Sequence, residues 1–186
     1  MAANINADTS GGLKLTSDTS GVLELKSAGT TIATVNSTGI AMASGKLLAS
    51  TGPAFIATPS AAQTLSSGTW TTIAFNTEVY DTNGNYNTST YAFTPTVAGY
   101  YNFTSNIRSA STTSRFYTKF LKNGSISYYG NDFNFAANSL NSNYSALIYM
   151  NGSGDSVVAQ AFLQGSGGLA LGASVPIYSA FLARAA

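Results

Sequence analysis

Residues 53 to 186 form a series of short segments in which polar and apolar side chains alternate, separated by turns rich in Gly, Asn and Ser. Alternation with a period of two residues is typical of a β-strand that buries one face. The Asn123-Gly124 pair indicates a tight hairpin, because both residue types tolerate the positive φ of such turns. No segment sustains the 3.6-residue period of a helix. The pattern predicts an all-β sandwich or jelly roll, with strands at 69–75, 90–94, 99–104, 115–121, 145–150, 156–162 and 176–182.

Composition divides the chain after residue 52. All four Pro, the single Trp, all eleven Tyr and all ten Phe lie between Pro53 and Ala186. Residues 41–52 are instead rich in Ala, Ser and Gly, which is typical of a linker. We therefore expect an extended N-terminal arm at 1–52 and a globular head at 53–186.

A ten-residue unit repeats in the arm, as ADTSGGLKLT at 7–16 and SDTSGVLELK at 17–26. Each unit combines a turn with a short strand whose two Leu side chains point to one face. Burial of two Leu contributes roughly 4 kcal/mol, whereas ordering ten residues costs about 10–20 kcal/mol. The apolar face of the arm must therefore be buried by other copies of the chain or by a surface on which the arm lies. The side chains expected to make these assembly contacts are Leu13, Leu15, Leu23, Leu25, Ile32 and Val35.

Charged and metal-binding side chains are scarce. Only 8% of residues are charged and the net charge is +1, which argues against nucleic acid and acidic membrane surfaces as partners. Cys and His are absent, so the commonest thiol nucleophile, general base and zinc ligands are missing. The seven carboxylates are scattered along the chain. We expect no enzymatic activity, no catalytic residue, no metal site and no cofactor.

The loop at 81–85, DTNGN, has the oxygen-bearing side chains of a calcium loop. Calcium prefers about six to eight oxygen ligands, including a well-placed carboxylate outside such a short loop. No Glu follows at the expected distance, so we interpret the segment as a hairpin turn.

The head contains an ordered series of short motifs: AF at 54–55, Phe75, NGNY at 83–86, YAFTP at 91–95, VAGYYNF at 97–103, KFLKNG at 119–124, Leu147, GDSV at 154–157 and SAFL at 179–182. In this order and at this spacing they resemble the globular head of complement C1q, within the tumour-necrosis-factor-like superfamily. The resemblance covers nearly all of 53–186. It implies a ten-stranded jelly roll that forms a homotrimer, with both ends of the head at one pole. It places in the core or at the trimer seam Phe75, Phe93, Tyr101, Phe103, Phe120 and Phe181.

The arm has a resemblance of its own. The segment TSDTSGVLELKSAGTTIATVNSTGI at 16–40 is similar to N-terminal segments of structural proteins from tailed bacteriophages. The resemblance implies a location in a virus particle. No collagen-like Gly-X-Y stem is present, so the immune function of complement is not implied.

Together these features predict a non-enzymatic capsid decoration protein on the outer capsid surface of the virion. Its expected partners are itself, as a homotrimer, and the phage major capsid protein. The alternative is the tip of a tail or neck fibre that binds host surface glycans. In that alternative Tyr128, Tyr129 and Phe133 would form the ligand surface, although the same rings also suit the core or the trimer seam.

Overall fold

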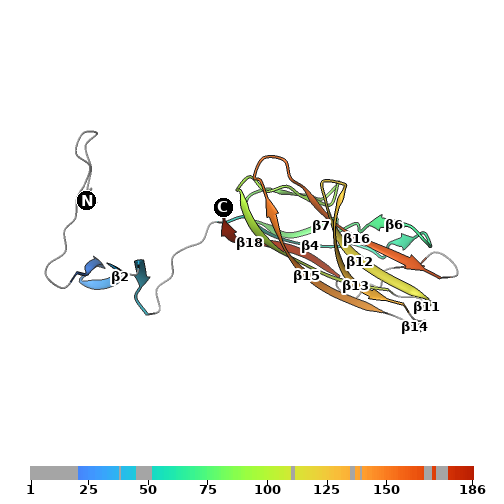
Figure 1. Cartoon of the computed structure of the whole chain (residues 1–186), viewed down its shortest axis with the longest axis horizontal. Helices are drawn as coiled ribbons and strands as arrows, with labels where there is room; N and C mark the ends of the chain where they lie inside the picture. The colour runs from blue at the N-terminus through green and yellow to red at the C-terminus, as the bar shows by residue number, and fades with distance from the viewer. Residues whose placement is uncertain are drawn as a thin grey trace. The chain divides into compact units, whose positions relative to one another are not determined.

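The computed structural model describes residues 21–37, 39–44, 52–109, 112–134, 137–138, 140–165, 169–170 and 176–186. The chain divides into two compact units, Met1–Ser50 and Thr51–Ala186. All regular secondary structure of the described residues is β-strand, so the all-β prediction is confirmed (Figure 1). The predicted contact residues Leu13 and Leu15 lie outside the described residues.

The described part of the arm is an antiparallel meander of β1 (Leu23–Ser27), β2 (Thr30–Asn36) and β3 (Gly39–Met42). Directly opposed residues share a face of a sheet, and two rows of opposed residues are apolar. These rows form what we call the arm face: Leu23, Val35 and Ile40 in one row, and Leu25, Ala33 and Met42 in the other.

The arm face is incompletely covered within its own unit. Leu25 is 46% exposed and Ile40 is 71% exposed. Ile32 is not part of an opposed pair, because the register shifts between Leu25 and Lys26 and leaves Ile32 as the extra residue of a bulge. The meander thus presents one apolar surface that its own residues do not bury.

The head consists of two main sheets (Figure 1). The five-stranded sheet has the order β15 (Asn141–Met150), β10 (Gly99–Arg108), β18 (Ile177–Ala185), β4 (Ala54–Thr58) and β7 (Thr77–Asp81). The six-stranded sheet has the order β13 (Ile126–Phe133), β12 (Arg115–Lys122), β16 (Val157–Gln164), β9 (Ala92–Phe93) and β8 (Tyr86–Asn87), and β6 (Trp70–Thr72) pairs with β16. Two further pairs join β11 (Thr112–Thr113) to β14 (Ala137–Asn138) and β5 (Thr64–Leu65) to β17 (Leu169–Ala170).

The number and length of the strands differ from the sequence-based expectation. The described head has fifteen strands rather than ten, and six of them are two-residue segments. The expected strand at 69–75 stops at Thr72, because the chain turns where the Phe75 amide donates to the Ile73 carbonyl at 2.9 Å. The strand expected at 90–94 shrinks to β9, because Tyr91 has a φ of 60° that strand backbone does not allow.

The core lies between the two main sheets, because alternate side chains of each long strand point inward. Burial alternates residue by residue along β10 and β16. The structure places in this core Phe75, Phe93, Tyr101, Phe103 and Phe120, all fully buried. Phe181 is 51% exposed on the outward face of β18 and is therefore not a core residue.

The first and last strands of the head are neighbours. Ala54 at the start of β4 pairs with Phe181 near the end of β18, and the Leu182 amide donates to the Pro53 carbonyl at 3.0 Å. The chain therefore enters and leaves the head at the same end.

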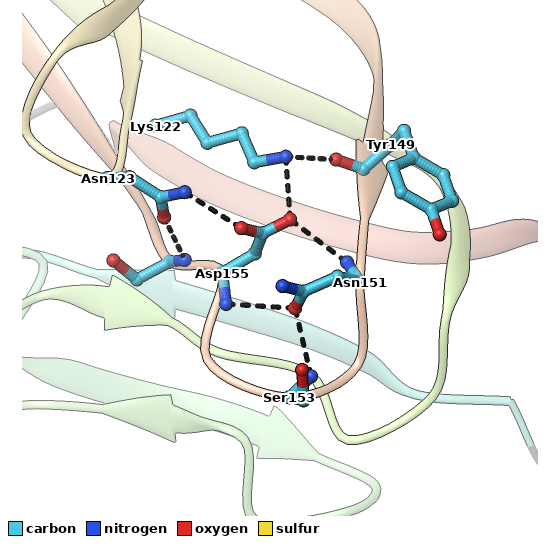
Figure 2. A network of polar contacts seen from close by, with 7 residues as sticks. Lys122, Asn123, Tyr149, Asn151, Ser153 and Asp155 are labelled. Atoms are coloured by element: carbon cyan, nitrogen blue, oxygen red, sulfur yellow. Dashed lines mark hydrogen bonds and ion pairs between the residues drawn. The ribbon is translucent and has the colours of Figure 1, made fainter.

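A buried ion pair ties two loops together (Figure 2). Lys122 Nζ lies 2.6 Å from Asp155 Oδ2 and donates to the Tyr149 carbonyl at 2.7 Å. Asp155 also accepts from Asn123 Nδ2 at 2.7 Å and from the Asn151 amide at 2.9 Å. Burial alone would raise the pKa of Asp155, but the hydrogen bonds from Lys122, Asn123 and Asn151 outweigh it and lower the pKa. The network fixes the β12–β13 turn against the β15–β16 loop.

We expect Asp155→Ala to lower the free energy of unfolding by about 3 kcal/mol, because it leaves the Lys122 ammonium buried without its counter-charge. The Asp155 pKa is lower in the folded chain, so its stabilisation is complete above the unfolded pKa of about 4 and is lost as pH falls through the folded value. Urea unfolding at neutral pH and at about pH 3 measures both effects. Glu78→Ala, at an exposed carboxylate, is the control and should change little. Equal midpoints for the Asp155 variant and the parent would contradict the stabilising role.

Candidate functional site

The outward face of β12 carries Arg115, Tyr117 and Lys119 at alternate positions. The residues between and beyond them, Phe116 and Phe120, are fully buried in the core. One face of β12 thus packs in the core, and the other face carries a row of charged and aromatic side chains.

Neighbouring strands extend this row across the sheet. Tyr117 lies opposite Asp132 of β13 and Phe162 of β16, and Phe162 in turn lies opposite Trp70 of β6. A second row places Lys119 between Tyr129 of β13 and Gln160 of β16. The two rows bring together residues that lie far apart in the sequence.

Together the rows line an open hollow of about 330 Å³ that we call the aromatic basin, lined by Trp70, Arg115, Tyr117, Tyr129 and Phe162. The Trp70 ring lies near all three other rings, and its centroid is 5.2 Å from that of Tyr117, 6.0 Å from that of Tyr129 and 5.6 Å from that of Phe162. Its angles to these rings are 53°, 54° and 48°, so the rings form tilted walls rather than one flat stack.

A carboxylate holds one side of the basin in place. Arg115 Nε donates to Asp132 Oδ1 at 2.9 Å, and Arg115 Nη2 donates to Asp132 Oδ2 at 2.6 Å. These hydrogen bonds lower the pKa of Asp132, which is therefore ionised at neutral pH. The bidentate geometry fixes the plane of the guanidinium, whose carbon lies 5.4 Å from the Tyr117 ring centroid.

Lys119 is a cation beside the basin that is only 9% exposed. Its Nζ lies 4.3 Å from the Trp70 ring centroid and 5.6 Å from that of Tyr129, and it hydrogen-bonds to Ser127 Oγ at 3.1 Å. Within the described part of the chain, Lys119 forms no ion pair with a carboxylate. The Lys119 ammonium is thus held by two ring faces and one hydroxyl group.

A β-bulge in β13 directs two side chains into this site. Tyr129 and Asp132 are three residues apart, so in a regular strand they would point to opposite faces. The register shift between Tyr117 and Lys119 inserts an extra residue in β13 and places both side chains on the outward face. At Gly130, within the bulge, a Cβ would lie 2.7 Å from Tyr144 Cγ and 2.8 Å from Thr118 Oγ1. Only glycine fits there without displacing its neighbours.

The structure separates the three residues expected to form a ligand surface. Tyr129 is 52% exposed and lines the basin. Tyr128 and Phe133 instead pack against the core, and Phe133 stacks on Phe116 with ring centroids 6.4 Å apart. No sequence motif indicates Trp70, Tyr117 and Phe162 as site residues, because only the pairing of β6, β16 and β12 brings them together.

In the loop at 81–85 the Asp81 carboxylate accepts hydrogen bonds from backbone amides of the same segment. Asp81 Oδ1 accepts from the Asn83 amide at 3.2 Å, and Asp81 Oδ2 accepts from the Tyr86 amide at 2.6 Å. In the residues that the structure describes, no group of three or more His, Cys, Asp or Glu side chains could hold a metal ion. Nor is any helix among them long and apolar enough to span a membrane.

The outward face of the five-stranded sheet is a second exposed surface, which we call the sheet face. Tyr100 lies opposite Tyr149, and Asn102 lies between Leu147 and Phe181. Their apolar side chains are exposed: Tyr100 by 44%, Tyr149 by 42%, Leu147 by 60% and Phe181 by 51%. A hollow of about 280 Å³ beside them is lined by Tyr100, Leu147, Ala183 and Arg184.

Two sheets around an aromatic core define the head as a jelly-roll β-sandwich. The C1q domain family matches residues 54–182, and the chain belongs to that family. The prediction of a C1q-like head is therefore confirmed. The matched residues begin after the arm, whose phage resemblance stays a prediction.

Solved structures have the same fold. The globular domain of zebrafish complement 1qA is 21% identical, with a TM-score of 0.55, and the match covers 73% of this chain and 99% of that domain. Murine APRIL at pH 5.0 is 9% identical with a TM-score of 0.54, covering 70% of this chain and 98% of that one. At these identities the likeness shows the fold alone. No curated protein matches the sequence significantly.

We expect Gly130→Ala to disturb both stability and the aromatic basin, because the added methyl group collides with Tyr144 and Thr118. Such overpacking costs about 1–3 kcal/mol, and emission from Trp70, the only Trp of the chain, should shift. Urea unfolding and fluorescence spectra measure the two effects.

Gly124→Ala in the turn of the same hairpin is the matched control for Gly130→Ala. Its φ is +67° and no atom beyond its chain neighbours lies within 4 Å of the added Cβ, so only backbone strain of about 1 kcal/mol applies. Its Trp70 emission should match that of the parent. Identical spectra for both variants would contradict the role of the bulge.

Proposed function

We propose that this protein is a non-enzymatic, homotrimeric structural protein of a tailed-phage virion. In this proposal it decorates the outer capsid surface, where its arm binds the major capsid protein. The observation that carries the proposal is the arm face, an exposed apolar surface on a unit separate from the head.

The sheet face supports a trimeric head. Tyr100, Leu147, Tyr149 and Phe181 gather on one outward sheet surface and remain exposed in a single chain. Apolar surfaces of this kind mark sites of protein association. The C1q family match favours a trimer, in which each copy would cover the sheet face of the next.

The arm face supports attachment to another protein. Three short strands bury little of their own apolar surface, so a partner that covers Leu25 and Ile40 stabilises the arm as it binds. In the described arm Glu24 pairs with Lys26, and we propose that the arm attaches mainly through apolar contact. A capsid shell offers a repeated protein surface for three such arms.

We expect the double variant Leu147→Asp, Phe181→Asp to dissociate the trimer, because two charges would be buried at each contact. Light scattering at micromolar concentration should report one chain instead of three, with an unchanged β-sheet circular dichroism spectrum. Ile126→Asp is the control, because Ile126 is 50% exposed on β13 of the other main sheet. A monomeric parent protein would refute the trimer itself.

We expect the double variant Leu23→Ser, Leu25→Ser to leave the head folded. The variant should no longer bind the capsid, because it loses about 4 kcal/mol of apolar burial per arm. Quantitative gels of purified particles measure occupancy, and Glu24→Ser between the two Leu is the control. Particles without the protein should assemble and then rupture earlier on heating, because a decoration protein stabilises only the shell that it binds.

The aromatic basin favours a second candidate, a receptor-binding tip of a tail or neck fibre. A tip would be present in a few trimers per particle, whereas a decoration protein occupies threefold positions over the whole shell. A few copies, normal shell stability and loss of host adsorption would establish the tip and refute decoration.

A further inference from the structure

We propose that the aromatic basin binds an acidic saccharide, with a sugar ring on the aromatic side chains and its carboxylate beside Lys119. The inference deepens the fibre-tip candidate by naming its ligand class. It holds equally for a head displayed on the capsid, because it depends only on residues of the head.

The lining of the basin matches one face of a sugar ring. Four of its five lining residues are aromatic, and the Trp70 ring lies within about 6 Å of the other three. A pyranose ring has a face of C–H bonds that packs on aromatic rings, while its hydroxyl groups point outward to polar partners. The hollow of about 330 Å³ is in the size range of small-ligand sites.

Lys119 supplies the preference for an anion. A charged group that is only 9% exposed is stabilised by an opposite charge. Its ammonium lies over the rings of Trp70 and Tyr129, which both line the basin, and no described carboxylate pairs with it. A ligand carboxylate at the edge of these two rings would provide the missing charge.

The opposite side of the basin offers groups for hydroxyl recognition. Asp132 holds the Arg115 guanidinium over the Tyr117 and Phe162 rings, at 5.4 and 5.8 Å from their centroids. Carboxylate oxygens accept more than one hydrogen bond each, so Asp132 can accept from sugar hydroxyls as well. Because Asp132 balances Arg115, the net charge of the site is the single positive charge of Lys119.

This charge pattern separates a saccharide from other ligands of aromatic grooves. A proline-rich peptide uses such grooves but brings no anion to Lys119. A nucleic acid requires a cluster of cations, and residues 53–186 hold five Lys and Arg against four Asp and Glu. An acidic sugar uses the rings, the hydroxyl acceptors and the one uncompensated cation together.

Trp70 provides a direct measurement, because it is the only Trp of the chain and it lies in the basin. The full-length protein is titrated with tetragalacturonate and with sialyllactose while Trp emission is recorded. The neutral counterparts are methyl-esterified tetragalacturonate and lactose. We expect a saturable change with at least one acidic sugar, and binding about tenfold weaker for its neutral counterpart.

Variants separate the rings from the charge. Tyr129→Ala, at a side chain that is 52% exposed, should weaken acidic and neutral sugars alike by about tenfold. Lys119→Gln should remove the preference for the acid while binding of the neutral sugar persists. Arg108→Gln, an equal loss of charge on β10 of the other main sheet, should bind like the parent.

Three results would overturn the proposal. They are no saturable change with either acidic sugar, equal affinity for acidic and neutral sugars, and a Trp70 response to decaproline instead of to sugars. None of them bears on capsid decoration, which is judged by particle occupancy and heat release.

Discussion

The buried ring of Tyr178 connects the two main sheets of the head. Tyr178 belongs to β18 of the five-stranded sheet, and its hydroxyl donates to the Val157 carbonyl of β16 in the six-stranded sheet at 2.9 Å. It is fully buried, and burial raises its pKa well above the usual value, so the hydroxyl stays neutral and keeps its proton. Its ring meets Phe55 edge-on at 4.9 Å and stacks on Phe120 at 5.9 Å. This contact fixes the two sheets against each other.

Every second side chain of a long strand points into the core, and the side chains between them form the outward surfaces. Phe116 and Phe120 point inward from β12, so Tyr117 and Lys119 point outward to the aromatic basin. The five-stranded sheet divides its residues in the same way and leaves exposed apolar side chains at one end of its outer side, whereas outward pairs such as Thr104 and Ser145 are polar. The head thus has one outward face with rings and charges and another with a group of exposed apolar residues. Each face suits a different kind of partner.

The sequence predicts local features of this fold well. Alternation located most of the long strands, and Asn123-Gly124 predicted a turn in which both residues have positive φ. The short motifs identified the family. Two-residue strands such as β9 were overestimated in length, because tertiary contacts, and not local alternation, decide where such a strand ends.

Features that depend on pairing between distant strands could not be predicted. Trp70 and Phe162 are neighbours only through the register of β6 and β16. The bulge at Gly130 reverses the directions that simple alternation gives for Asp132 and Phe133, so Phe133 packs against the core while Tyr129 lines the basin. In the arm, the position of Ile32 likewise depended on a bulge.

The adjacency of the first and last strands of the head bears on how such a protein changes over evolution. Because β4 and β18 pair at the end where the chain enters, the head is connected to the arm at a single point, next to its own C-terminus. The boundary between the units falls after Ser50. Recombination there would exchange one head for another without cutting any strand that the structure describes. One arm could in this way carry heads with different basins while its arm face stayed the same.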